Sequence, residues 1–280
     1  MVIEAGSRVE AAGEQVPVLR RVLRRLKNAV LRHERLYRLY LRLKFGGSED
    51  LKVMQPWVTN GTLKSRAEWE RAAAEGRRLR VPLHRGAEKN WDHLAAVFAI
   101  RKATTTVARV LDAGAEMYSN VLPALYRYGY RELYGMNLSF PYEARRGPIR
   151  YMPGDITRTG FADGFFDAVA CLSVIEHGVP LEGYFLEMLR VLRPGGVLIT
   201  STDYFPEPVE TGGQRAHGAP IKIFSRAEME AMLRLAESVG FERTGAVDLD
   251  CDERPVRWEQ FGLEYSFVLF TLRKPVAQSS

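Results

Sequence analysis

Residues suited to ligand binding and acid–base chemistry follow five apolar runs in the C-terminal two-thirds of the chain. The residues at these positions are Asp112, Gly114 and Glu116, then Asn137, then Asp155 and Ile156, then Ser173 and His177, and last Asp203. Carboxylates, amides and hydroxyls hold polar ligands through hydrogen bonds. His177 or Asp203 can accept a proton from a reacting group. The pattern predicts one site built from five loops, provided that the runs are strands of one sheet.

Strand and helix patterns alternate from about residue 107 to residue 274. Strands are predicted at residues 108–114, 132–138, 149–156, 166–177, 197–205, 244–250 and 265–274. Helices are predicted at residues 121–129, 181–196 and 225–241. Fully apolar strands that alternate with helices are typical of a parallel sheet covered by helices on both faces.

We therefore predict an α/β class fold, Rossmann-like, with a doubly wound, mostly parallel, seven-stranded sheet. No helix pattern separates the last two strands, so the C-terminal strand should run antiparallel at the edge. Ligands of such sheets bind beyond the carboxyl ends of the strands, where the strand order reverses. This rule brings the five loops together at one edge.

Residues 1–88 form a predicted helical N-terminal extension, and residues 89–280 form the main domain. Within the extension, residues 17–45 have apolar side chains at three- and four-residue spacing with arginines on the opposite face, which predicts one helix or two. Residues 20–44 contain ten Lys or Arg and one Glu, a net charge of +9 against +6 for the whole chain. The basic charge therefore belongs to one element.

Three interpretations of this basic helix stay open. It can be a solvated helix packed on the domain, or it can contact an anionic membrane through residues 17–45 with its arginines at the headgroups. It can also bind nucleic-acid phosphates, which we favour least.

Composition limits the class of protein further. The chain is 46% hydrophobic and has no run of 18 apolar residues, so no membrane-spanning helix is expected. Its first residues lack the apolar core of a secretory signal. Two cysteines, Cys171 and Cys251, make no disulfide framework. We expect a cytoplasmic protein, free or peripheral at the inner face of the membrane, and no metal site.

Five sequence motifs occur in a characteristic order: "VLDAG", "GMNLS", "PGDI", "FADGFFDAVACLSVIEH" and "EMLRVLRPGGVLITSTDYF". In this order and spacing the chain resembles the class I S-adenosylmethionine-dependent methyltransferases over roughly residues 90–274. The block from Gly154 to Gly196 is the most specific part. With its late segment "PIKIFSRAEM", the chain is most similar to the methyltransferases associated with glycan and polysaccharide biosynthesis.

The resemblance implies S-adenosylmethionine as the cofactor and a role for each loop. Asp112, Gly114 and Glu116 would face the methionine part, and Gly114 would let the backbone approach it closely. Asn137 stands where the family usually has an acid for the ribose hydroxyls. Asp155 matches the residue that accepts from the adenine amino group, and Ile156 the apolar wall beside the ring. Ser173 completes the expected cofactor contacts.

The expected reaction is O-methylation of a sugar or glycan hydroxyl, with His177 or Asp203 as the general base. An Asn/Asp-Pro-Pro-Tyr motif is missing after the fourth strand, which favours an oxygen acceptor over a nitrogen acceptor. Two alternatives stay open. Glu116, Tyr118 and Asn137 depart from the usual loops, which is compatible with a methyltransferase-like binding module that has lost its activity. The basic helix is compatible with an RNA methyltransferase.

Overall fold

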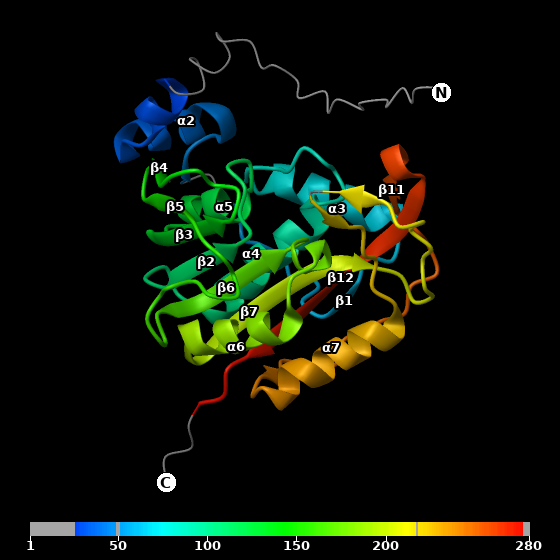
Figure 1. Ribbon diagram of the computed structural model, residues 1–280. Helices are drawn as coiled ribbons and strands as arrows, with labels where there is room; N and C mark the ends of the chain where they lie inside the picture. The colour runs from blue at the N-terminus through cyan, green and yellow to red at the C-terminus, as the bar shows by residue number, and fades with distance from the viewer. Residues whose placement is uncertain (1–25, 49–50, 217, 277–280) are drawn as a thin grey trace, which may run out of the picture.

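A twisted, mostly parallel sheet runs through the part of the chain that the structure describes (Figure 1). The structure, a computed structural model, describes residues 26–48, 51–216 and 218–276. The five parallel strands are β2 (Arg109–Ala113), β3 (Glu132–Asn137), β5 (Ile149–Pro153), β6 (Phe166–Leu172) and β7 (Leu192–Tyr204). The long strand β12 (Leu263–Arg273) pairs antiparallel with β7. The predicted α/β fold with an antiparallel C-terminal strand is confirmed.

The strand order places the predicted loops at one edge. β2 pairs with β3 on one side and with β6 on the other, and both pairings are parallel. The chain leaves β2 toward β3 and β5, then crosses back to β6 and β7. The strand order therefore reverses beside β2, and a crevice at such a point is the usual ligand site of an open α/β sheet.

Helices cover both faces of the sheet. Helices α4 (Asn90–Ala103) and α5 (Val121–Arg127) pack together on one face, and α6 (Leu181–Val191) and α7 (Arg226–Ser238) pack together on the other (Figure 1). The α7 helix begins with a capping box, in which the Ser225 side chain accepts from the Glu228 N–H and the Glu228 carboxylate accepts from the Ser225 N–H. Residues 226–238 are therefore helical for local reasons as well as packing.

The predicted number of seven strands was wrong, because short strands extend the sheet to ten. Four of them are too short to show an apolar period: β1 (Gly61–Thr62), β4 (Ala144–Arg146), β10 (Glu242–Arg243) and β11 (Val256–Trp258). The strand predicted at residues 244–250 does not form. Instead, β1 of the N-terminal extension pairs with the middle of β12, on the side away from β7. Asp248 makes a single isolated bridge to Gly61 of β1.

The described residues of the N-terminal extension include three helical segments. Residues 26–31 are helical, the chain turns at Arg32–His33, and α2 follows at Glu34–Phe45. Helix α3 (Arg66–Arg78) packs against α4. Residues 17–45 were predicted to form one helix or two, and two are present where this stretch is described; residues 17–25 lie outside the described residues.

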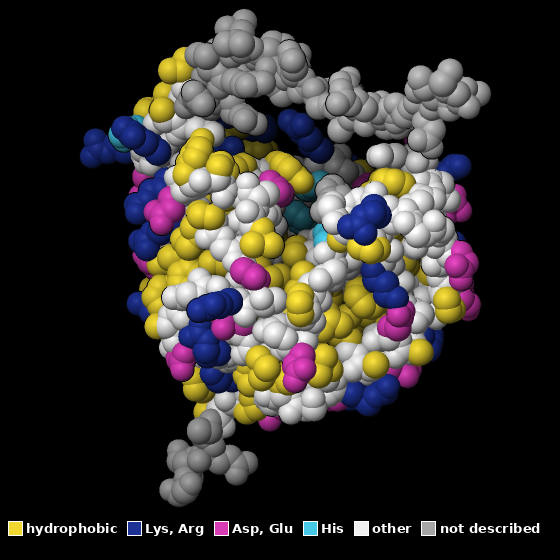
Figure 2. Space-filling view, in the orientation of Figure 1, with side chains coloured by type: hydrophobic (Ala, Val, Ile, Leu, Met, Phe, Trp, Pro, Cys, Tyr) yellow, Lys and Arg dark blue, Asp and Glu magenta, His cyan; other side chains and the backbone are white. Residues whose placement is uncertain are grey.

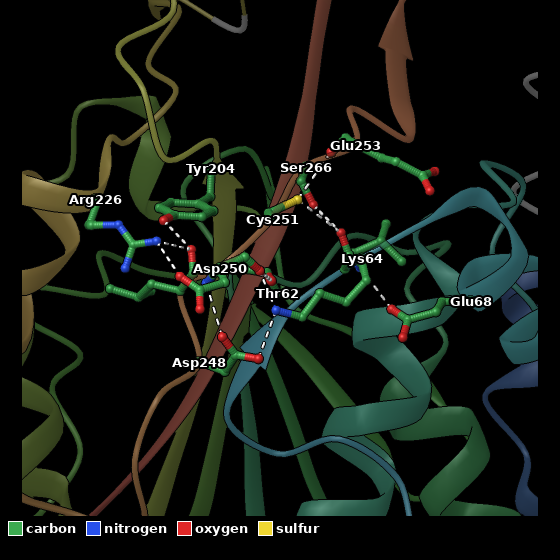
Figure 3. Close-up of polar contacts among 12 residues, drawn as sticks. Thr62, Lys64, Glu68, Tyr204, Arg226, Asp248, Asp250, Cys251, Glu253 and Ser266 are labelled. Carbon is green, nitrogen blue, oxygen red and sulfur yellow. Dashed lines mark hydrogen bonds and ion pairs between the residues drawn. The ribbon is translucent and has the colours of Figure 1, made fainter.

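Hydrogen bonds fasten the extension to the main sheet (Figure 3). Thr62 Oγ1 donates to the Asp250 carbonyl at 2.6 Å, and Lys64 Nζ lies 2.7 Å from the Asp248 carboxylate. Leu63 between them is fully buried, and its backbone N–H donates to the Phe267 carbonyl of β12. The boundary at residue 88 stays a prediction, but residues 61–64 are packed as part of the sheet.

No helix within the described residues is both long and apolar enough to cross a bilayer.

Replacing Leu63 by Ala tests how far the extension contributes to folding. We expect it to lower the free energy of unfolding by about 2–5 kcal/mol, because a fully buried leucine leaves a cavity. Val53→Ala, at a side chain that is 80% exposed, should change it by less than about 0.5 kcal/mol. Urea unfolding of the full chain measures both. Equal, negligible effects would mean that the extension is an independent appendage.

Candidate active site

Asp112 lies at the carboxyl end of β2 and is buried among apolar residues. Its side chain is 4% exposed, and its Oδ2 atom has no hydrogen-bond partner. Burial, assisted by the nearby Asp92, raises the pKa of the Asp112 carboxyl to about 7. A buried carboxyl with an unpaired oxygen is costly unless a partner arrives. Asp112 is therefore suited to receive a cationic or hydrogen-bond-donating ligand group.

Gly114 follows Asp112 and makes the turn that opens this loop. Its φ is +90°, a conformation that favours glycine, and its N–H donates to the Met136 carbonyl of β3. A Cβ at this position would lie 2.3 Å from a methyl carbon of Val174. The glycine is thus required both by the backbone conformation and by the close approach of the loop after β6.

Glu116 and Asn137 are joined in one polar cluster. Asn137 Nδ2 donates to the Gly114 carbonyl at 3.1 Å and to Glu116 Oε1 at 3.4 Å. Ser139 donates to both side chains, through its N–H to Asn137 Oδ1 and through its hydroxyl to Glu116 Oε1. The end of β3 has Asn137 in place of an acid, but the loop after β2 supplies the Glu116 carboxylate within hydrogen-bond distance of Asn137.

Asp155 and Ile156 follow β5, beside the end of β3. Gly154 N–H donates to the Asn137 carbonyl, which ties the two loops together. The exposed Asp155 accepts from the backbone N–H and the hydroxyl of Thr157, both at 2.8 Å, so it makes a local turn. Ile156 is 6% exposed and packs in the core. This geometry is compatible with an adenine contact at Asp155 but is also satisfied without one.

Ser173 ends β6 with its backbone in the left-handed region, at φ +53°. Its N–H donates to the Ser201 carbonyl of β7, and its hydroxyl accepts from Lys89 Nζ at 2.6 Å. The same Nζ lies 3.7 Å from Asp203 Oδ1. Lys89, just before α4, therefore links the loop after β6 to the end of β7.

Asp203 and Glu176 are two buried carboxyls near this lysine. Burial raises the pKa of Asp203 to about 6, although Lys89 opposes the shift. Burial and the charge of Asp203 raise the pKa of Glu176 to about 8, and Thr202 Oγ1 donates to Glu176 at 3.0 Å. The carboxylates raise the pKa of Lys89 despite its own burial. Burial thus raises the pKa of both carboxyls, and Lys89 opposes the shift at each of them.

His177 is half-buried at the end of a short 3₁₀ helix, η2 (Ile175–His177), in the loop after β6. Its N–H donates to the Val174 carbonyl, and Gly178 follows with φ +80°. The neighbouring residue Glu176 is buried, unlike His177, and accepts a hydrogen bond from Thr202. The two proposed bases thus lie at the same edge, His177 in the loop after β6 and Asp203 near the carboxyl end of the adjacent strand β7.

The site also includes residues at the start of α4 that no sequence motif indicated. Asp92 is fully buried, with one oxygen accepting from Ser201 Oγ at 2.7 Å and the other without a partner. His93 Nδ1 is buried without a partner, and burial lowers the pKa of His93 to about 4. The His84 ring contacts the rings of His93 and Tyr118. Only their place before the first strand of the main domain could have suggested these residues.

Four buried polar atoms without hydrogen-bond partners thus gather around the carboxyl ends of β2 and β7. They are Asp92 Oδ1, His93 Nδ1, Asp112 Oδ2 and Asp203 Oδ1. Figure 2 shows a hollow near the middle of this face, with histidine side chains in its wall. Asp203 Oδ1 forms an ion pair with Lys89 at 3.7 Å, which leaves Asp92 Oδ1, His93 Nδ1 and Asp112 Oδ2 as the unpaired buried atoms of this edge. Buried polar groups are normally paired, so these three atoms are candidates for contacts with a ligand.

A groove of about 740 Å³ lies elsewhere, against β1, α3 and residues 55–58, and none of the predicted site residues line it. Its charged side chains are largely paired, Lys64 with Asp248 and Arg78 with Glu75. We therefore assign the site by its unpaired buried groups and not by cavity size. Among the described residues, no three His, Cys, Asp or Glu side chains are grouped to hold a metal ion.

Residues 111–200 match the family model described as "Methyltransferase domain". This stretch of the chain is therefore similar to a methyltransferase domain, which supports the coarser part of the expected resemblance. The association with glycan biosynthesis stays a prediction.

Curated relatives match over shorter stretches. A sterol 24-C-methyltransferase of Yarrowia lipolytica is 32% identical over 120 residues, which are 39% of this chain and 30% of the relative. A demethylmenaquinone methyltransferase of Beutenbergia cavernae is 44% identical over 57 residues, 20% of this chain and 24% of the relative. The chain thus spans less than a third of the length of these relatives.

Among solved structures, the 1,6-didemethyltoxoflavin-N1-methyltransferase of Burkholderia thailandensis, with bound 1,6-didemethyltoxoflavin and S-adenosylhomocysteine, is similar. The TM-score is 0.48 at 17% identity, over 75% of this chain and 87% of that one.

Gly114→Ala tests whether the first loop is built around the close contact with Val174. We expect a loss of unfolding free energy of about 2–5 kcal/mol, from the left-handed backbone and the displaced valine together. Gly160→Ala is the matched control, since Gly160 also has a positive φ but no atom within 4 Å of its added Cβ. It should cost only about 1–2 kcal/mol. Equal losses in chemical unfolding would show that Val174 moves aside freely.

Proposed function

We propose that this protein is an S-adenosylmethionine-dependent methyltransferase that uses the site at the carboxyl edge of the sheet. The observation that carries the proposal is the coincidence of two features. Residues 111–200 match a methyltransferase domain, and the strand ends at Asp112 and Asp203 hold buried carboxyl oxygens without hydrogen-bond partners. A structural role alone would not retain such costly groups.

The charge of the site fits this cofactor. Asp92, Asp112, Glu176 and Asp203 are buried there, with Lys89 as the nearby cation. S-adenosylmethionine carries an ammonium group and a sulfonium centre, and when bound it supplies a methyl group activated for displacement. We assign Asp112 to hold the cationic methionine part, since its oxygen is unpaired and a cation would stabilise the ionised carboxylate that burial disfavours.

The other predicted residues fit the remainder of the cofactor. Gly114 keeps the first loop free of a Cβ. Glu116, which Asn137 and Ser139 orient, is our candidate for accepting hydrogen bonds from the ribose hydroxyls. The Asn137 amide carries no charge and would be a weaker acceptor. Asp155 and Ile156 would bind the adenine by a hydrogen bond and apolar contact. Ser173 would act indirectly, by holding Lys89.

For the acceptor we propose a hydroxyl group of a small molecule, a sugar or glycan in the first place, and a cytoplasmic site of action. An acceptor hydroxyl must lose its proton as the oxygen is methylated. Asp203 is our first candidate for the base, because burial raises its pKa and so makes it a better proton acceptor, while Lys89 favours its ionised form. Lys89 orients it from 3.7 Å away. His177, in the next loop, is the second candidate.

Cofactor binding should depend on pH through Asp112. With a pKa of about 7, the free carboxyl must lose its proton before it pairs with a cation, so affinity should fall as the pH is lowered from about 8 to about 6. Calorimetry with S-adenosylhomocysteine at several pH values measures this. Asp112→Asn should bind about 10- to 100-fold more weakly, with a flatter pH profile.

Two results would contradict this assignment. An unchanged affinity in Asp112→Asn would place the cofactor elsewhere. The absence of binding to the wild-type protein at high micromolar cofactor would favour a methyltransferase-like binding module. Asp163→Asn is the control, because Asp163 is an exposed carboxylate paired with Arg190 in the turn before β6, and this change should leave affinity unchanged.

The base is identified by comparing two variants under single-turnover conditions with an accepted hydroxyl substrate. Asp203→Asn should lower the rate of methyl transfer by about 10²–10⁴-fold while S-adenosylhomocysteine still binds. His177→Ala should lower it by less than about tenfold if the histidine only lines the site. The reverse order of effects would assign the base to His177, and normal rates in both variants would exclude both residues as the general base.

A further inference from the structure

Helix α2 and the helical residues 26–31 before it carry two sets of apolar side chains, and one of these sets packs on other described parts of the protein. Leu31, just before α2, and Tyr37 and Leu41 within it are 5%, 2% and 3% exposed. A second set, which we call the outer stripe, is exposed by 42–80% and comprises Leu26, Val30, Leu36, Leu39 and Leu43. Spacings of three and four residues align Leu36, Leu39 and Leu43 along one side of α2. Helix α2 therefore has a row of solvent-exposed leucines.

The outer stripe lies on an element that is held firmly. The Tyr37 ring stacks on Tyr126 of α5 with centroids 5.4 Å apart. The Leu31 carbonyl accepts from the Gly147 N–H at 2.9 Å, and the Gly46 carbonyl after α2 accepts from Arg127 at 3.0 Å. The inner side of α2 is therefore committed to the domain. The exposure of the outer stripe is not explained by helix packing within the described residues.

Basic side chains border the outer stripe. In helical projection Arg35, Arg38 and Arg42 fall along one side of it, and all three are exposed. Lys27, Arg32 and Lys44 are exposed near its ends. The acid of this region, Glu34, is already paired with Arg38 at 3.0 Å. An exposed leucine row edged by arginines is the arrangement of a helix that lies in the interface of an anionic bilayer.

We propose that the outer stripe docks this protein on an anionic lipid bilayer. The leucines insert between the headgroups and the acyl chains, and the arginines pair with lipid phosphates. Charge selects this partner over the others. A second copy of this face would bring arginines against arginines, and nucleic-acid phosphates would leave the leucines exposed. The proposal does not depend on methyl transfer.

Docking would occur close to the candidate active site. Gly147, which bonds to Leu31, follows β4, and Arg146 of β4 donates to the Met117 carbonyl in the loop after β2. The segment Arg146–Gly147 therefore connects the residues just before α2 to the loop that carries Gly114 and Glu116.

Vesicle flotation of the full chain tests the proposal. We expect binding to vesicles of phosphatidylcholine with added phosphatidylglycerol, weaker binding to phosphatidylcholine alone, and loss of binding at high salt. The triple variant Leu36→Gln, Leu39→Gln, Leu43→Gln should bind at least about tenfold more weakly. Arg35→Gln with Arg38→Gln should weaken binding and reduce its salt dependence. Leu186→Gln, at an equally exposed leucine of α6, is the matched control and should bind normally.

Three outcomes would overturn the proposal. Undiminished vesicle binding by the triple leucine variant would move the contact elsewhere. Absence of vesicle binding together with salt-dependent RNA binding would assign the arginines to nucleic acid. A wild-type dimer that the leucine changes dissociate, without vesicle binding, would assign the stripe to a second copy. Cofactor calorimetry on the same variants should be unchanged, so failure here is distinguishable from failure of the proposed enzyme activity.

Discussion

The burial of carboxyl groups at the carboxyl ends of β2 and β7 is the constraint on which the rest of the site depends. Asp112 and Asp203 are each 4% exposed, and each has an oxygen without a hydrogen-bond partner. The neighbouring elements are arranged around these groups. The start of α4 brings Asp92 and Lys89, and the loop after β6 brings Glu176 and Ser173. A fold selected for stability alone would replace such groups by apolar ones.

Burial makes the carboxyl groups of this site retain their protons to a higher pH than exposed carboxyls do. Asp112 and Glu176 have pKa values of about 7 and 8, above their ordinary values of 3.8 and 4.5. Between the ordinary and raised values the folded chain binds more protons than the unfolded chain, so these two groups lower stability as the pH rises through that window. A bound cation reverses this effect, because it favours the ionised carboxylates. Ligand binding, proton release and stability are thus linked in one set of side chains.

The sequence predicted the central parallel strands, because long apolar runs alternate with helix patterns and their polar ends must meet at one edge. It could not predict the outer side of β12, where two residues of β1 pair and the strand predicted at 244–250 does not form. Pairing of such short segments depends on tertiary contacts. Lys89 was missed for a similar reason, since its partners Ser173 and Asp203 are distant in sequence. Asn137 was read without Glu116, although their contact supplies the carboxylate.

An infrared titration of the Asp112 carboxyl tests the central claim most directly. The difference spectrum between the wild-type protein and Asp112→Asn isolates the protonated carboxyl band. We predict that this band titrates with a pKa of about 7 in the protein alone, and that saturating S-adenosylhomocysteine moves the transition to clearly lower pH. A transition near the ordinary aspartate value in the protein alone, or one that the cofactor leaves in place, would contradict the account.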